Sequence, residues 1–262
     1  MLLDAVNWLN AAGIETKTFG DLFVLLLAKR VIQLGYGLET LCEAGYAGDA
    51  APLARTMLNG AINLVYLAEA DRDGRAAAYV KQEQLIRRKR IKRILAQCEA
   101  DRVAGRRPML SEDQVAQLHQ DDVRVTADEE AKLAELARQG IVPVKRGNNP
   151  NTWTGFTERE LYQAMNAESW YLSFYALFSD AAHVSANSLT GSLNEILQGV
   201  SFFGPQFEDP QFVVRASHQA VLQVLYQLER LYGLGKFAEA KAIDQQMLAA
   251  IGSYQQPEQA GD

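Results

Sequence analysis

LARTMLNGAINLVYL, residues 53–67, is the stretch that decides the fold, because it is apolar almost all the way round a helix. A second stretch of the same character, WYLSFYALFSDAAHVSANS, occupies residues 170–188. A helix that is apolar on nearly every side is buried among other elements rather than exposed on a surface. The two stretches therefore predict a helical bundle in which both of these helices are internal.

The rest of the chain extends this pattern to an all-α protein. Helical periodicity predicts a multi-helix bundle with long antiparallel helices, and no segment alternates with period two for long enough to form a sheet. Three helix starts carry a capping box, in which a Ser or Thr is followed three residues later by Glu or Gln: Ser111, Thr126 and Thr157. The predicted helices are residues 2–12, 18–44, 50–70, 75–104, 112–121, 127–139, 158–166, 168–185, 188–198, 210–232 and 236–251.

The breaks between helices predict the domain organisation. Residues 1–200 are expected to form the main bundle, residues 201–254 a C-terminal helical hairpin packed on it, and residues 255–262 a frayed tail. The longest irregular stretch, residues 140–156, is expected to be an ordered loop, because loops of this length in compact proteins are often functional. It contains Trp153, which we count among the candidate ligand-binding residues.

Composition places the chain among ordinary globular proteins. Of its 262 residues 48% are hydrophobic and 22% are charged, which is typical of neither a disordered nor a fibrous chain. Cys42 and Cys98 show no metal-ligand or redox spacing, so reduced core thiols and a cytoplasmic location are expected. The N-terminal residues do not resemble a signal peptide. The longest apolar run, residues 22–28, is too short to span a bilayer, so no membrane association is expected.

Polar residues on the two apolar helices predict a site. Arg55, Asn59, Asn63 and Tyr66 follow one another at helical spacing, and Tyr175, Ser179 and His183 do so on the second helix. A buried Arg or His must be paired to be tolerated. If the two lines face each other, their side chains could bind an anion, or His183 could act as a general base on Ser179 or on a water. Alternatively, all of them are structural, with amides bonded to carbonyls and His183 a satisfied core residue.

Signatures of other chemistries are missing from the sequence. It contains neither a phosphate-binding GxxxxGK[ST] nor a GxGxxG motif that opens a helix, and no HExxH or GxSxG motif. The three histidines, His119, His183 and His218, are too scattered to suggest a metal centre. We therefore expect no metal and no cofactor.

One predicted helix is strongly basic. From Arg75 to Arg107 there are eleven Lys or Arg and three acids, a local balance of +8; since the whole chain is −6, the remainder carries −14. The centre of the run, IRRKRIKR at residues 86–93, could grip phosphates or an acidic partner, or it could pair with acids of the same molecule. Its candidate nucleic-acid-binding residues are Arg87, Arg88, Lys89, Arg90, Lys92 and Arg93.

A family resemblance rests on four of these features together: ARTMLNGAINLVYL at residues 54–67, the basic helix, the Trp–Thr–Gly at residues 153–155, and YLSFYALFSDAAHVSANS. The combination resembles a widespread bacterial family known only as a domain of unknown function, over roughly residues 45–195. The resemblance implies an all-α fold with an Arg–x–x–x–Glu turn and a Tyr–x–x–x–Ser–x–x–x–His–x–Ser line. The matching residues here are Arg55, Tyr175, Ser179, His183 and Ser185.

The chain departs from this pattern at Asn59, where the family usually has Glu. Arg55 must then find its acid elsewhere, and Glu39, Glu43 and Asp180 are the candidates. A looser likeness is to the higher eukaryotes and prokaryotes nucleotide-binding superfamily, helical proteins that include ribonuclease toxins and phage-defence effectors. The nuclease signature of that superfamily, Arg followed after four to six residues by His, is matched by none of the three histidines, so a ribonuclease of that type is disfavoured.

Three functions follow from these observations. The first is a cytoplasmic protein that binds an anionic small molecule or nucleotide at Arg55, Ser179 and His183, in a bacterial stress or phage-defence setting. The second is a metal-independent hydrolase or nuclease that uses His183 as general base and the basic helix to grip substrate. The third is an interaction protein that forms homo-oligomers through its apolar helices.

Overall fold

The structure is a computed structural model that describes residue 7, residues 13–175 and residues 211–253. Within these residues it is helical and contains no β-strand, which confirms the predicted all-α class. The chain folds into two compact units. We call residues 1–70 with 158–262 the bundle unit and residues 71–157 the hairpin unit. The predicted domain boundary at residue 200 lies outside the described residues and stays a prediction.

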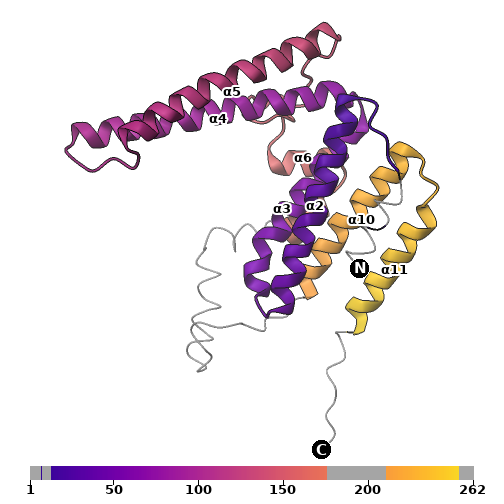
Figure 1. The fold of residues 1–262 in the computed structure, drawn as a ribbon. Coiled ribbons are helices and arrows are strands. Elements are labelled where there is room, and N and C mark those ends of the chain that lie inside the picture. Colours follow the sequence, from indigo (N-terminus) through magenta and orange to yellow (C-terminus); the bar gives the residue numbers. More distant parts are fainter. Residues whose placement is uncertain (1–6, 8–12, 176–210, 254–262) are drawn as a thin grey trace, which may run out of the picture. The chain divides into compact units, whose positions relative to one another are not determined.

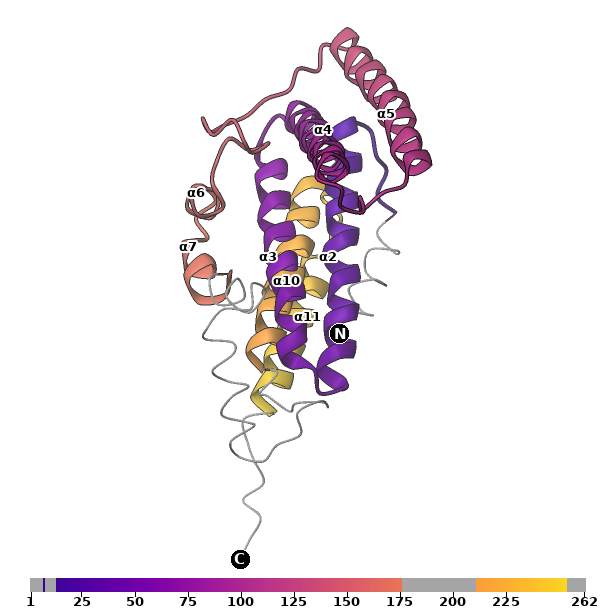
Figure 2. The same ribbon diagram turned by 90° about the vertical axis from the view of Figure 1, so that its left-hand side faces the viewer.

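Four long helices form the bundle unit: α2 (Phe19–Glu43), α3 (Ala47–Glu69), α10 (Gln211–Tyr232) and α11 (Phe237–Ser253). Figure 2 shows α2 and α3 side by side, joined by a short turn, with α10 packed against both and α11 against α10. Gly60 allows α2 and α3 to approach closely, because a Cβ there would meet the side chain of Val31 at 2.7 Å.

The apolar sequence of α3 explains its central place in this unit. Twelve of its residues are buried, and Leu58, Ile62 and Leu64 are at most 1% exposed. Burying an aliphatic side chain of this size stabilises a fold by about 1.5–3 kcal/mol. The prediction that residues 53–67 form an internal helix is confirmed.

The ends of the bundle helices are held by specific hydrogen bonds. Thr18 and Asp21 form a capping box at the start of α2, and the hydroxyl of Tyr232 donates to the Asp21 carboxylate at 3.3 Å. At the C-terminal end of α3, Arg230 donates to the carbonyl of Ala68 at 3.4 Å. The last turn of α10 is thereby fixed to the start of α2 and to the end of α3.

Three short elements lie beside α3: α6 (Glu158–Ala164), α7 (Glu168–Trp170) and the π-turn η1 (Tyr171–Tyr175). The predicted helix at residues 168–185 begins as expected, but after one turn it continues with π geometry to Tyr175. Its remainder, and the predicted helix at residues 188–198, lie outside the described residues.

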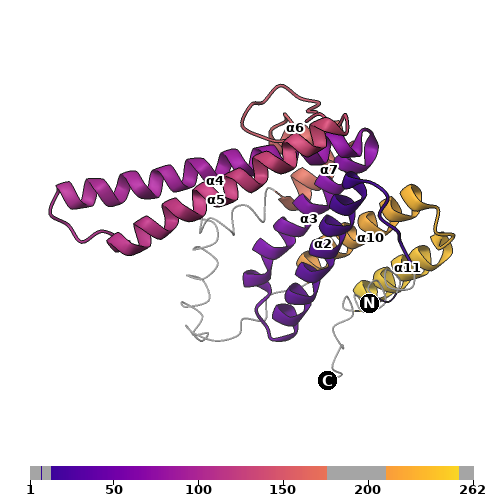
Figure 3. The same cartoon turned by 45° about the horizontal axis from the view of Figure 1, so that its top comes forward.

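The hairpin unit consists of α4 (Arg72–Val103), α5 (Glu112–Arg138) and the loop that follows them. Figures 1 and 3 show α4 and α5 side by side as a long pair. The capping box at Ser111 is confirmed. The one at Thr126 is wrong, because α5 runs through that position without a break and Thr126 instead accepts a hydrogen bond from Arg87.

The loop at residues 140–156 is irregular and ordered, as predicted. It returns to the start of α4, where the amide of Val144 donates to the carbonyl of Gly74 at 2.9 Å and Gln82 donates to the carbonyl of Asn151 at 2.8 Å. Two glycines of the loop, Gly147 and Gly155, lie backbone to backbone.

Candidate functional site

Arg55 on α3 and Tyr175 in η1 meet across 120 residues of sequence. An Nη of Arg55 donates to the hydroxyl of Tyr175 at 2.9 Å, and the guanidinium carbon lies 4.9 Å from the centre of the same ring. Arg55 is 23% exposed, whereas Tyr175 is buried. A cation held over an aromatic face and hydrogen-bonded to it has few alternative positions, so the guanidinium is fixed in place while part of it remains accessible.

An acid also lies beside Arg55. Glu158, the first residue of α6, brings a carboxylate oxygen to 3.9 Å from the guanidinium and is itself 49% exposed. Of the acids that the sequence suggested, Glu39 and Glu43 form no ion pair with Arg55 in the described part of the chain, and Asp180 lies outside it. Glu158 was missed because no spacing rule connects it to a helix a hundred residues earlier.

Three tyrosines gather at this point: Tyr162, Tyr171 and Tyr175. The rings of Tyr171 and Tyr175 are stacked, with centres 5.3 Å apart, and the ring of Tyr162 lies 5.5 Å from that of Tyr175. Tyr162 is fully buried, and its hydroxyl has no hydrogen-bond partner among the described residues. We call Arg55, Glu158, Tyr162, Tyr171 and Tyr175 the Arg55 cluster.

Both buried tyrosines keep their protons at neutral pH. Burial, and then the Glu158 carboxylate, raise the pKa of Tyr175 to about 12, while Arg55 acts in the opposite direction. Burial raises the pKa of Tyr162 further, with Tyr175 and Glu158 adding to the effect and Arg55 opposing it. The oxygen of Tyr175 accepts from Arg55, and its own proton is donated to the Glu158 carboxylate. The hydroxyl of Tyr162 is therefore the donor that this cluster can offer beside a fixed cation.

The amides of the predicted line occupy the same face of α3. Asn63 donates to Asn59 at 3.4 Å, and both are half-buried. Tyr66, the last residue of the line, is fully buried and belongs to the core. Thus Arg55 and the two amides remain partly accessible, whereas Tyr66 does not.

Several other predicted site residues are not brought to this cluster. Ser179, His183 and Ser185 lie outside the described residues, so their roles stay predictions. Trp153 belongs to the hairpin unit, where its ring packs edge-on against Tyr79 with centres 5.3 Å apart.

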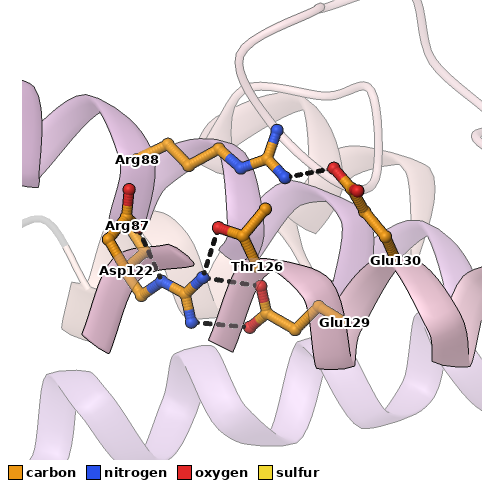
Figure 4. A network of polar contacts seen from close by, with 6 residues as sticks. All are labelled: Arg87, Arg88, Asp122, Thr126, Glu129 and Glu130. Atoms are coloured by element: carbon orange, nitrogen blue, oxygen red, sulfur yellow. Dashed lines mark hydrogen bonds and ion pairs between the residues drawn. The ribbon is translucent and has the colours of Figure 1, made fainter. Parts of the chain in front are cut away.

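The basic residues of α4 fall into two groups. Arg87 and Arg88 face α5, as Figure 4 shows. Arg87 binds both carboxylate oxygens of Glu129 at 3.0 and 2.9 Å, with Thr126 at 3.4 Å and Asp122 at 3.9 Å, and Arg88 binds Glu130 at 2.5 Å. Lys89, Arg90, Lys92 and Arg93 are exposed and make no ion pair with any residue in the ranges that the structure describes.

A buried histidine was also missed. In the sequence His218 is one of three scattered histidines, but in the structure it is 3% exposed on α10, and neither ring nitrogen has a partner within the described ranges. Its signal was available, because Val221, Leu222 and Leu225 follow it at three, four and seven positions and so lie on the same, apolar side of its helix.

Two further findings concern the described residues alone. These residues contain no group of three or more His, Cys, Asp or Glu side chains that could hold a metal ion. None of their helices combines the length and hydrophobicity needed to cross a bilayer.

Comparisons with known proteins agree with the residues that carried the family resemblance. Searches against curated proteins and against solved structures returned no match. A family model matches residues 21–196, which include most of α2, all of α3, the whole hairpin unit and the elements that carry Glu158, Tyr162 and Tyr175. Because this match covers more than half of the chain, the protein belongs to the family described as "Family of unknown function (DUF5677)".

Proposed function

We propose that this protein binds an anionic small molecule, such as a nucleotide, at the Arg55 cluster. Arg55 supplies the charge, and the hydroxyl of Tyr162 supplies a neutral donor beside it. Anion sites are commonly built in this way, from one fixed guanidinium and a few hydrogen-bond donors that need not move when the ligand arrives.

The observation that carries the proposal is the hydroxyl of Tyr162. A buried donor without a partner costs about 1–3 kcal/mol, so native proteins rarely keep one without a purpose. The ring that carries this hydroxyl lies 5.5 Å from the ring of Tyr175, whose own hydroxyl binds Arg55. A bound anion would satisfy the hydroxyl of Tyr162 and would at the same time be attracted by Arg55.

The first experiment is native mass spectrometry of the protein purified from its expression host, before and after denaturation. We expect a small anionic molecule to accompany the folded protein and to be released on unfolding. Calorimetric titration of the stripped protein with ATP and with inorganic phosphate then measures affinity directly. A clean mass together with no heat from either probe would overturn the proposal.

Variants show whether the cluster holds the ligand. Arg55→Gln should weaken binding at least about tenfold, the usual loss for a hydrogen bond to a charged group. Tyr162→Phe should weaken binding similarly while leaving the melting temperature unchanged or higher, because it removes a hydroxyl that has no partner in the unliganded protein. The matched control is Tyr36→Phe, which removes the hydroxyl of an exposed tyrosine on α2. Unchanged affinity in Tyr162→Phe would mean that only water occupies this position.

Replacing Glu158 should change the affinity for the ligand in the opposite direction. Its carboxylate competes with an incoming anion for Arg55, so Glu158→Gln should tighten binding of either probe by up to about fivefold, the equivalent of one exposed ion pair. A structural Arg55–Glu158 pair would instead show lower stability with no effect on affinity. This contrast separates a ligand site from a structural contact.

A further inference from the structure

The side of α4 that faces away from α5 carries cations and no acid over its central turns. Between Gln84 and Cys98 the exposed residues are Leu85, Ile86, Lys89, Arg90, Lys92, Arg93, Ala96 and Gln97, and none of them is acidic. At 3.6 residues per turn these positions share one face of the helix. We call Lys89, Arg90, Lys92 and Arg93 the α4 basic face.

The α4 basic face and the paired arginines lie on opposite sides of α4. Ile91 and Cys98 are buried on the opposite side of α4, and Arg87 and Arg88 lie there with them, bound to Glu129 and Glu130 of α5. Acids of the same molecule therefore neutralise two of the six basic residues at positions 87–93. The other four are exposed and unpaired in the described part of the chain.

We propose that the α4 basic face binds the phosphate backbone of a nucleic acid without reading its bases. The four cations lie within two turns of one rigid helix, with Lys89 and Arg93 about 6 Å apart along its axis. This row suits a polyanion whose charges repeat along a stiff strand. The exposed residues between Gln84 and Cys98 include no aromatic side chain on which a base could stack, and Gln97 is the only amide among them, so the contacts available are to phosphates.

The charge of the rest of the chain restricts where such a partner can bind. Residues 75–107 carry +8, and the remainder carries −14, which repels nucleic acid. An acidic protein overall can therefore bind nucleic acid only through a local face of this kind. Four phosphate contacts on duplex DNA predict that the logarithm of the affinity falls with the logarithm of salt concentration with a slope of about −3.6.

The test is fluorescence anisotropy with a labelled 20-base-pair DNA duplex and an RNA duplex, from 50 to 200 mM salt, with the full-length protein. We expect binding with this salt slope. The fourfold variant Lys89→Gln, Arg90→Gln, Lys92→Gln, Arg93→Gln should lose it, and each single variant should reduce the slope by about 0.9. The single variants also test the proposal if the fourfold variant folds poorly by circular dichroism.

The matched control has the same change in net charge at exposed cations elsewhere: Lys29→Gln, Arg30→Gln, Lys132→Gln, Lys241→Gln. Its binding should be close to that of the wild type. The proposal is overturned by wild-type protein that binds neither duplex at 50 mM salt, or by equal losses in the two fourfold variants. Binding of polyglutamate with no binding of either duplex also overturns it, in favour of an acidic protein partner.

Discussion

His218 on α10 is a titratable side chain in the core of the bundle unit. Its imidazole is 3% exposed, and burial lowers its pKa to about 4 from the ordinary value near 6.5. The unfolded chain takes up a proton near pH 6.5, whereas the folded protein does so only near pH 4. The unfolded state therefore binds more protons between these values, and stability must fall as pH decreases through this window.

We expect the free energy of unfolding to be constant above about pH 6.5 and to fall by about 3 kcal/mol by pH 4, given 1.36 kcal/mol per unit of pKa shift. Urea denaturation at half-unit intervals of pH measures this change. His218→Leu should remove most of this dependence, and His119→Leu, a change at an exposed histidine on α5, should leave it intact. Identical pH profiles for the wild type and His218→Leu would mean that His218 has a partner in solution.

At the same scale, the sequence revealed some site residues and concealed others. Helical spacing identified Arg55 and Tyr175, and the structure brings these two together. It could not identify Glu158 or Tyr162, because α6 comes to α3 through tertiary packing, which leaves no periodic trace in the sequence. Tyr162 and its neighbour Leu161 are both buried, but their helix has only seven residues, which are too few to show a clear apolar face. The burial of Tyr162 could therefore not be predicted from the sequence.

Among the elements, α5 shows why helix ends were the least predictable feature. Thr126 followed by Glu129 is a capping box by sequence, but in the structure both side chains bind Arg87 of α4. The two side chains are polar, as the motif requires, but they bind an arginine of the neighbouring helix instead of capping a helix end. Arg87 lies on the same side of α4 as the buried Ile91 and Cys98, and the ion pair forms on that side.

One backbone contact within the loop after α5 is very close. Gly155 has φ of +79°, and a Cβ there would collide with the carbonyl group of Gly147. Gly155→Ala should therefore destabilise the protein by more than the roughly 1–2 kcal/mol that left-handed geometry alone imposes on a residue with a Cβ.

Gly140 provides the matched control for this prediction. It has the same φ of +79°, but a Cβ there meets nothing within 4 Å. Chemical denaturation of both alanine variants separates the cost of the collision from the cost of the left-handed backbone conformation. Both variants have the second cost, but only Gly155→Ala creates the collision. Equal losses of stability would contradict the tight Gly147–Gly155 contact.

Across the whole molecule, burial is distributed very unevenly. α3 has twelve buried residues, whereas α5, with 27 residues, has only Leu136. Large apolar side chains of the hairpin unit are exposed, among them Val103, Met109 and Val123. Local opening of a helix requires less free energy when few apolar contacts must be broken, so the two helices should differ in stability within one folded chain.

Hydrogen–deuterium exchange of the intact protein measures this difference. We expect amides of α5 to exchange at least about a hundredfold faster than those of α3, the equivalent of roughly 3 kcal/mol in opening free energy. If α5 were as protected as α3, its exposed apolar residues would have to be covered in solution, as they would be in a homo-oligomer. Light scattering then shows whether the protein with a strongly protected α5 is a monomer or an oligomer. A monomer would contradict the burial that the structure shows. An oligomer would identify the hairpin unit as its interface.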